Sequence, residues 1–100
     1  MTLLEAINHI RELPENGILF VEPISGEFRS DSRTVALELS DSELELPTAS
    51  VAALRAPGTE YFLEIYIIRE FIESWQLENP GIPLFPQAVQ RIIRYAVNDA

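Results

Sequence analysis

The chain has no cysteine and no lysine, and it has a single histidine among its 100 residues. The absence of cysteine excludes disulfides, thiolate metal sites and a cysteine nucleophile, and it leaves the redox compartment undetermined. The absence of lysine removes the interleaving of basic and aromatic residues that is typical of nucleic-acid-binding domains. His9 is the only histidine, so few metal sites or acid–base pairs could be built, and we interpret it as a partly solvated surface residue.

Glycine is also scarce, because only four glycines are present and all are isolated, which excludes a glycine-rich phosphate loop. No stretch approaches the roughly eighteen uninterrupted apolar residues of a membrane span. The opening residues, MTLLEAINHIREL, lack the basic segment and the apolar core of a signal peptide. We therefore expect a cytoplasmic protein with no membrane, nucleic-acid, cofactor or metal partner.

Acidic residues, in contrast, are abundant. The chain carries sixteen acids against seven bases, all of them arginine, for a net charge of −9. Such a charge repels nucleic acid and attracts basic partners. It also aids solubility by itself, so the composition leaves both interpretations open. The length predicts one domain over residues 1–100.

The first half of the chain contains one helix pattern and two strand patterns. Thr2 and Glu5 form a T-x-x-E capping box that opens a helix, and Pro14 ends the periodic apolar pattern. Residues 18–21 form a short apolar run that predicts a buried strand. Residues 34–39 alternate in polarity, and we expect them to pair antiparallel with the first strand.

The stretch YFLEIYIIREFIESWQL is the richest in apolar residues. Placed on one helix, Glu64 would fall within the apolar arc and Phe62 on the polar side. The best interpretation is a short strand at Tyr61–Leu63 that turns directly into a helix from about Ile65 to Leu77.

Two more helices are predicted, a short one over residues 48–56 and a last one in which Pro86 takes the first position. We expect the last helix to turn five apolar side chains inward: Val89, Ile92, Ile93, Ala96 and Val97. The element order indicates an α+β domain in which a small antiparallel sheet of about three strands packs against three to four helices.

A run of acids provides the first candidate site. Glu38, Asp41, Glu43 and Glu45 lie close in sequence without a neighbouring base, and they could steer and dock a basic protein. The alternatives are a solvated acidic edge and, less favoured, a hard-cation site. Phe28, in a long loop between the two predicted strands, is either an exposed anchor of the same interface or a residue that folds back onto the core. Our first hypothesis is thus a non-catalytic interaction domain that binds a basic partner.

Apolar residues outside the expected core support a second hypothesis, a self-associating structural or adaptor domain. Tyr66 falls on the polar face of its predicted helix. Ile82, Leu84 and Phe85 lie among the prolines of an extended connector. If these four side chains are exposed together, they would form a homodimer interface.

A third hypothesis is a small-molecule binder with an aromatic pocket around Phe62, Tyr66 and Trp75. It has no recognisable catalytic group beside it, because the serines lack a G-x-S-x-G turn and a histidine partner. We therefore expect no enzyme activity. Trp75 is most simply a core residue, and the alternative is an apolar groove between the last two helices that suits a peptide or a second subunit.

Four short motifs resemble a family of small, acidic, uncharacterised bacterial proteins. They are Leu13-Pro14, Leu19-Phe20-Val21, Val35–Leu39 and the closing Tyr95-Ala96-Val97-Asn98-Asp99-Ala100. The resemblance covers most of the chain and implies no known activity. In size and charge the chain is also similar to bacterial immunity and antitoxin proteins, which neutralise basic toxins by charge complementarity.

Overall fold

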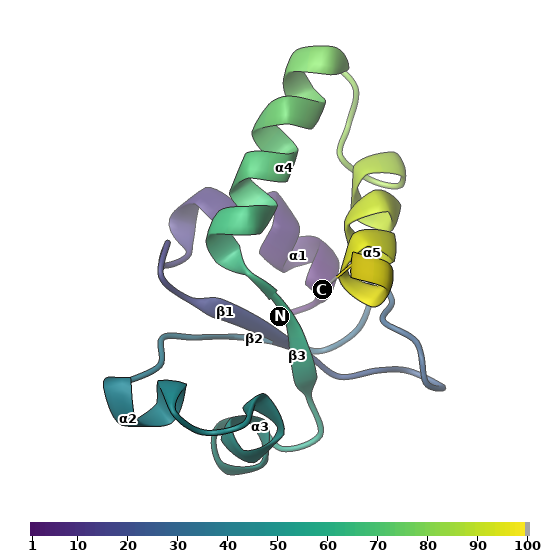
Figure 1. Cartoon of the computed structure of the whole chain (residues 1–100). Coiled ribbons are helices and arrows are strands. Elements are labelled where there is room, and N and C mark those ends of the chain that lie inside the picture. Colours follow the sequence, from purple (N-terminus) through teal and green to yellow (C-terminus); the bar gives the residue numbers. More distant parts are fainter. Residues whose placement is uncertain (100) are drawn as a thin grey trace.

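The computed structural model describes residues 1–99, so Ala100, the last residue of the closing motif, lies outside the described residues. The chain forms three β-strands and five α-helices in this part, and it has the predicted α+β class (Figure 1). The elements in order are α1 (Leu3–Asn8), a 3-10 helix η1 (Ile10–Glu12), β1 (Ile18–Val21), β2 (Thr34–Leu37), α2 (Asp41–Leu44), α3 (Thr48–Arg55), β3 (Glu60–Glu64), α4 (Ile65–Glu78) and α5 (Gln87–Asp99).

The three strands form one antiparallel sheet in the order β2-β1-β3. The predicted antiparallel pairing of the first two strands is confirmed, with Phe20 opposite Val35. The second strand ends at Leu37, two residues earlier than predicted. Helices α1, α4 and α5 lie on one side of the sheet, and α2 and α3 lie on the other (Figure 1). The sheet is therefore covered on both faces.

A β-bulge in β3 changes which way its side chains point. Leu19 pairs with Leu63 and Phe20 pairs with Tyr61, so Phe62 is the extra residue between them. A bulge interrupts the alternation of side chains along a strand. Phe62 and Leu63 consequently both join the same apolar core, whereas Tyr61 packs against the core on the other face.

Each face of the sheet has its own apolar core, because alternate residues of β1 point to opposite sides. The larger core lies between the sheet and helices α1, α4 and α5, and it contains Leu19, Val21, Phe62 and Leu63 from the sheet. The smaller core lies under α3, and it is made of Ile18, Phe20, Leu37, Val51, Ala52 and Ala56. The long helices and most of the buried apolar residues thus share one side of the molecule.

The first helix begins as its capping box predicts. The backbone N–H of Glu5 donates to the Thr2 hydroxyl at 3.1 Å, and the Glu5 carboxylate accepts from the Thr2 backbone N–H at 2.8 Å. The α-helix itself ends at Asn8, earlier than the apolar pattern predicts, and the chain continues as the 3-10 helix η1.

The predicted strand-to-helix transition is confirmed. β3 runs to Glu64 and α4 begins at Ile65, with no loop between them. The backbone N–H of Ile65 donates to the carbonyl oxygen of Gly17 at 3.0 Å, which fixes the transition against the start of β1. A Cβ atom on Gly17 would lie 2.8 Å from Cδ1 of Ile65, so a larger residue here would force the Ile65 side chain to shift.

Two further expectations differ from the structure. Residues 40–47 contain a short helix, α2, which is not among the predicted elements, and a second capping box between Ser40 and Glu43 begins it. The last helix begins at Gln87, one residue after the predicted start. Val97 is 63% exposed rather than turned inward, and the larger core ends at Ala96 on this helix.

Candidate interaction surfaces

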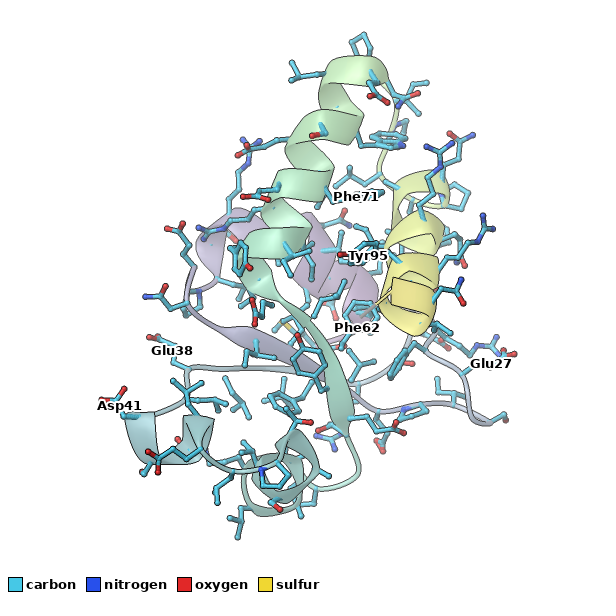
Figure 2. The ribbon with its side chains drawn as sticks, in the orientation of Figure 1. Glu27, Glu38, Asp41, Phe62, Phe71 and Tyr95 are labelled. Atoms are coloured by element: carbon cyan, nitrogen blue, oxygen red, sulfur yellow. The ribbon has the colours of Figure 1, made fainter. Side chains whose placement is uncertain are left out.

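The predicted acidic residues lie at one corner of the molecule, and we call Glu38, Asp41, Glu43 and Glu45 the acidic corner. Glu38 follows β2, Asp41 and Glu43 belong to α2, and Glu45 caps its end. Figure 2 shows Glu38 and Asp41 near each other at the edge of the molecule. The short helix α2 therefore brings together acids that the sequence places in one run.

Glu43 differs from the other three acids because it has a basic partner, contrary to expectation. Its carboxylate accepts hydrogen bonds from the Arg55 guanidinium at 2.7 and 2.8 Å and from the backbone N–H of Ser40 at 3.0 Å. The hydrogen bond from Ser40 and then the bonds from Arg55 lower the pKa of Glu43. The negative charge of Glu43 is thus paired within the fold, and its basic partner is Arg55 of α3.

The remaining three acids of the corner, Glu38, Asp41 and Glu45, are exposed and form no ion pair with any residue in the described part of the chain. Two leucines lie among them in sequence and are also exposed, Leu44 at 62% and Leu46 at 42%. The corner therefore combines free carboxylates with uncovered apolar side chains.

Phe28 does not belong to this corner. Its ring packs edge-on against the ring of Phe62, with the centroids 5.2 Å apart, and it joins the larger core from the side. Its neighbour Glu27 and the corner residue Asp41 lie at opposite sides of the molecule (Figure 2). Of the two interpretations of Phe28, the structure therefore supports the one in which the side chain folds back onto the core.

The four residues proposed for self-association do not form one patch. Tyr66, Ile82 and Phe85 are each about 45% exposed, but Leu84 is half-buried against the larger core. Tyr66 lies in the first turn of α4, whereas the other three follow its last turn. Leu84 lines a hollow with Ile72 and Gln76 of the later half of α4 and not with Tyr66.

The expected aromatic pocket is not formed by the predicted residues. Phe62 and Trp75 are only 1% and 3% exposed, so they offer almost no surface to a ligand, whereas Tyr66 projects outward. A hollow of about 270 Å³ lies instead between α4 and α5, and we call it the α4–α5 groove. Its lining consists of Leu63, Ile67, Ile68, Glu70, Phe71, Ser74, Ile92 and Tyr95.

The groove has an apolar floor and an aromatic wall. Leu63, Ile68 and Ile92 are buried beneath it, whereas Phe71 is half-buried and Tyr95 is 39% exposed. Figure 2 shows Phe71 and Tyr95 in the space between α4 and α5. A groove between the last two helices is one of the alternatives that the sequence leaves open. Its lining residues cannot be predicted from the sequence, because they depend on how the two helices pack.

Two tyrosines, Tyr61 and Tyr66, have raised pKa values to which Glu64 contributes. The Glu64 carboxylate raises the pKa of Tyr66, and Glu70 raises it further. Partial burial raises the pKa of Tyr61, and Glu64 again adds to the effect. Glu64 and Glu70 form no ion pair with any other described residue. Glu70, which lines the groove, therefore carries a charge that no other described residue pairs.

Within residues 1–99, no group of three histidine, aspartate or glutamate side chains is placed to hold a metal ion. No described helix has both the length and the apolar character needed to cross a membrane. A comparison of the chain with protein-family models, with curated proteins and with solved structures finds no match. The bacterial family that the sequence motifs resemble therefore remains a prediction.

Proposed function

We propose that this chain is a non-catalytic protein-interaction domain that binds a basic protein partner through its acidic corner. The observation that carries the proposal is the combination of free carboxylates on Glu38, Asp41 and Glu45 with the exposed side chains of Leu44 and Leu46. Carboxylates that have no partner in the fold steer a basic surface toward the corner and increase the association rate. The leucines then supply apolar area that a bound partner removes from water.

The internal pairing of Glu43 supports this use of the corner. Arg55 neutralises one acid and holds it against α3, so α2 has a defined position from which the other acids project. A second copy of the chain would bring the same negative charges together, which disfavours self-association at this corner. A basic toxin is one partner of the required chemistry, in keeping with the similarity of size and charge to immunity and antitoxin proteins.

The experiment that tests the proposal compares two charge-reversed proteins with the native one. In the corner variant, Asp41→Lys and Glu45→Lys are combined. In the matched control, Glu73→Lys and Glu78→Lys make the same change of net charge on α4. Each protein is immobilised and exposed to the native lysate at low salt, and the proteins that it retains are identified and purified.

The proposal expects one basic protein that is retained by the native chain and by the control and is lost from the corner variant. The affinity of this purified protein for the native chain should fall steeply with salt. A partner that binds the corner variant as well as the native chain would contradict the proposal. Retention of no protein at low salt would contradict it as well.

A further inference from the structure

The α4–α5 groove lies on the opposite face of the sheet from the acidic corner. Helices α4 and α5 cover one face, and the corner belongs to the α2–α3 side (Figure 1). The groove is also distinct in character, because two long helices form its sides and a β-strand residue, Leu63, contributes to its floor. The proposed function at the corner leaves this second surface without an explanation.

The volume of the groove limits what it can hold. At about 270 Å³ it lies below the roughly 300–1,000 Å³ of typical small-molecule pockets. Its lining is mainly apolar and aromatic, with the exposed polar residues Glu70 and Ser74. These dimensions suit a large apolar side chain, which would lie between Phe71 and Tyr95.

The acidic residues near the groove indicate which residues of the occupant should flank that apolar side chain. Glu70 lines the groove and Glu64 lies at the junction of β3 with α4. Among the described residues, Arg91 and Arg94 of α5 form no ion pair with either acid, and they line a separate hollow with Gln87. An occupant with a lysine or arginine next to its apolar side chain would therefore be favoured over a neutral or acidic one.

We propose that the α4–α5 groove binds a short basic amphipathic helix of a protein partner, with one large apolar side chain inserted between Phe71 and Tyr95. A third helix laid along a groove between two others is a common form of peptide recognition. Tyrosine and phenylalanine on the groove wall are residue types that supply binding energy at interfaces. The proposal adds a second surface to the chain and does not depend on the acidic corner.

The raised pKa of Tyr66 is consistent with this choice of partner. Glu64 is its main cause and Glu70, which lines the groove, adds to it, so negative charge acts beside the groove. A second copy of the chain fits less well. Each copy carries a net charge of −9, which opposes the approach of a second copy to this acidic surface.

The test uses three synthetic 14-residue peptides and needs no knowledge of the natural partner. The probe is a helix with a leucine face flanked by lysines. One control replaces every lysine with glutamate, and the other replaces every leucine with serine. Binding to the intact chain is measured by fluorescence anisotropy, and the site is located from changes in the NMR signals of the Ile67 and Ile92 methyl groups.

Two variants block the groove from different directions. Ser74→Trp fills it from an exposed position on α4, and Tyr95→Ser removes part of its wall. We expect each to reduce the affinity of the lysine–leucine probe at least tenfold, and we expect Glu70→Lys to reduce it roughly threefold, as for an exposed ion pair. Glu73→Lys, on another side of α4, is the matched charge control and should leave the affinity unchanged. Thermal unfolding of each variant confirms that it remains folded.

Several results would overturn the proposal. Equal binding of the serine control would show that charge alone attracts the probe. Signal changes at Leu44 and Leu46, without changes at Ile67 and Ile92, would place the probe at the acidic corner. If the NMR signals of Ile67 and Ile92 changed on dilution of the protein alone, and if the undiluted protein had the mass of a dimer, the groove would be assigned to a second copy. Absence of probe binding at millimolar concentration would also overturn it.

Discussion

The guanidinium group of Arg69 donates a hydrogen bond to the main-chain oxygen of Leu13, which lies 56 positions earlier in the chain. The same group donates to the carbonyl oxygens of Ile10 at 3.2 Å and Arg11 at 3.1 Å. The last carbonyl groups of a helix lack partners within the helix. One side chain of α4 therefore satisfies the end of η1 and joins the N-terminal segment to the longest helix.

We expect Arg69→Met to lower the free energy of unfolding by about 2–3 kcal/mol, because it removes charge-assisted hydrogen bonds to partly buried carbonyl groups. Urea unfolding measures the change. Arg91→Met is the matched control at an exposed position of α5 and should stay within about 0.5 kcal/mol of the native protein. If the two variants were equally stable, Arg69 would not have the role assigned to it.

The packing of Phe28 on Phe62 makes the second prediction. Phe28→Ala should destabilise the chain by about 2 kcal/mol, less than the roughly 3–5 kcal/mol of a fully buried phenylalanine, because Phe28 is only half-buried. Phe85→Ala, in the exposed connector, serves as the control and should cost less than half as much. Thermal or urea unfolding distinguishes the two. A Phe28→Ala protein of native stability would revive the interpretation of Phe28 as a free interface anchor.

Gly17 gives the third prediction, because a Cβ atom there would lie 2.8 Å from Cδ1 of Ile65 and 3.1 Å from the carbonyl oxygen of Pro14. We expect Gly17→Ala to destabilise the chain by about 1–3 kcal/mol through overpacking. Ile65→Val in the same protein removes the closest atom. A double-mutant cycle should therefore show that Gly17→Ala costs less in the Ile65→Val background. Strict additivity of the two changes would contradict the proposed contact.

The lowered pKa of Glu43 predicts how its contribution to stability depends on pH. A carboxyl group whose pKa is lower in the folded state stabilises the fold above its ordinary pKa of 4.5, and this contribution is lost as the pH falls through the lowered value. Glu43→Gln should therefore have a lower melting temperature than the native protein at pH 7. The difference should shrink as the pH falls below 4.5.

Glu45→Gln is the control for this pH dependence, since Glu45 is exposed and makes no ion pair within the described residues. Its melting temperature should follow that of the native protein at both pH 7 and acidic pH. A difference for Glu43→Gln that persisted unchanged at acidic pH would show that the substitution acts through packing rather than through charge.

Local patterns account for the elements that could be predicted from the sequence. The capping box at Thr2 begins α1, and the conflict of Glu64 and Phe62 with one continuous helix correctly separates β3 from α4. The capping box of Ser40 and Glu43 carries the same signal. The four-residue helix that follows it is too short to show an apolar period, so the capping box alone does not predict α2.

The surfaces could be predicted less well, because they depend on residues that are distant in sequence. Arg55 reaches Glu43 across the turn between α2 and α3, so a run of acids without a neighbouring base in the sequence does have one in space. The α4–α5 groove depends on the packing of two helices across a proline-rich connector. No periodicity within either helix reveals that Phe71 and Tyr95 line the same hollow.

The bulge in β3 has a consequence for recognising distant relatives of this chain. A strand pattern based on strict alternation would reject the segment Tyr61–Glu64, because Phe62 and Leu63 are adjacent large residues that share one core. A more selective search pattern is two consecutive apolar residues, then an acid, then the start of an amphipathic helix. A glycine immediately before β1, at the position of Gly17, would complete that signature.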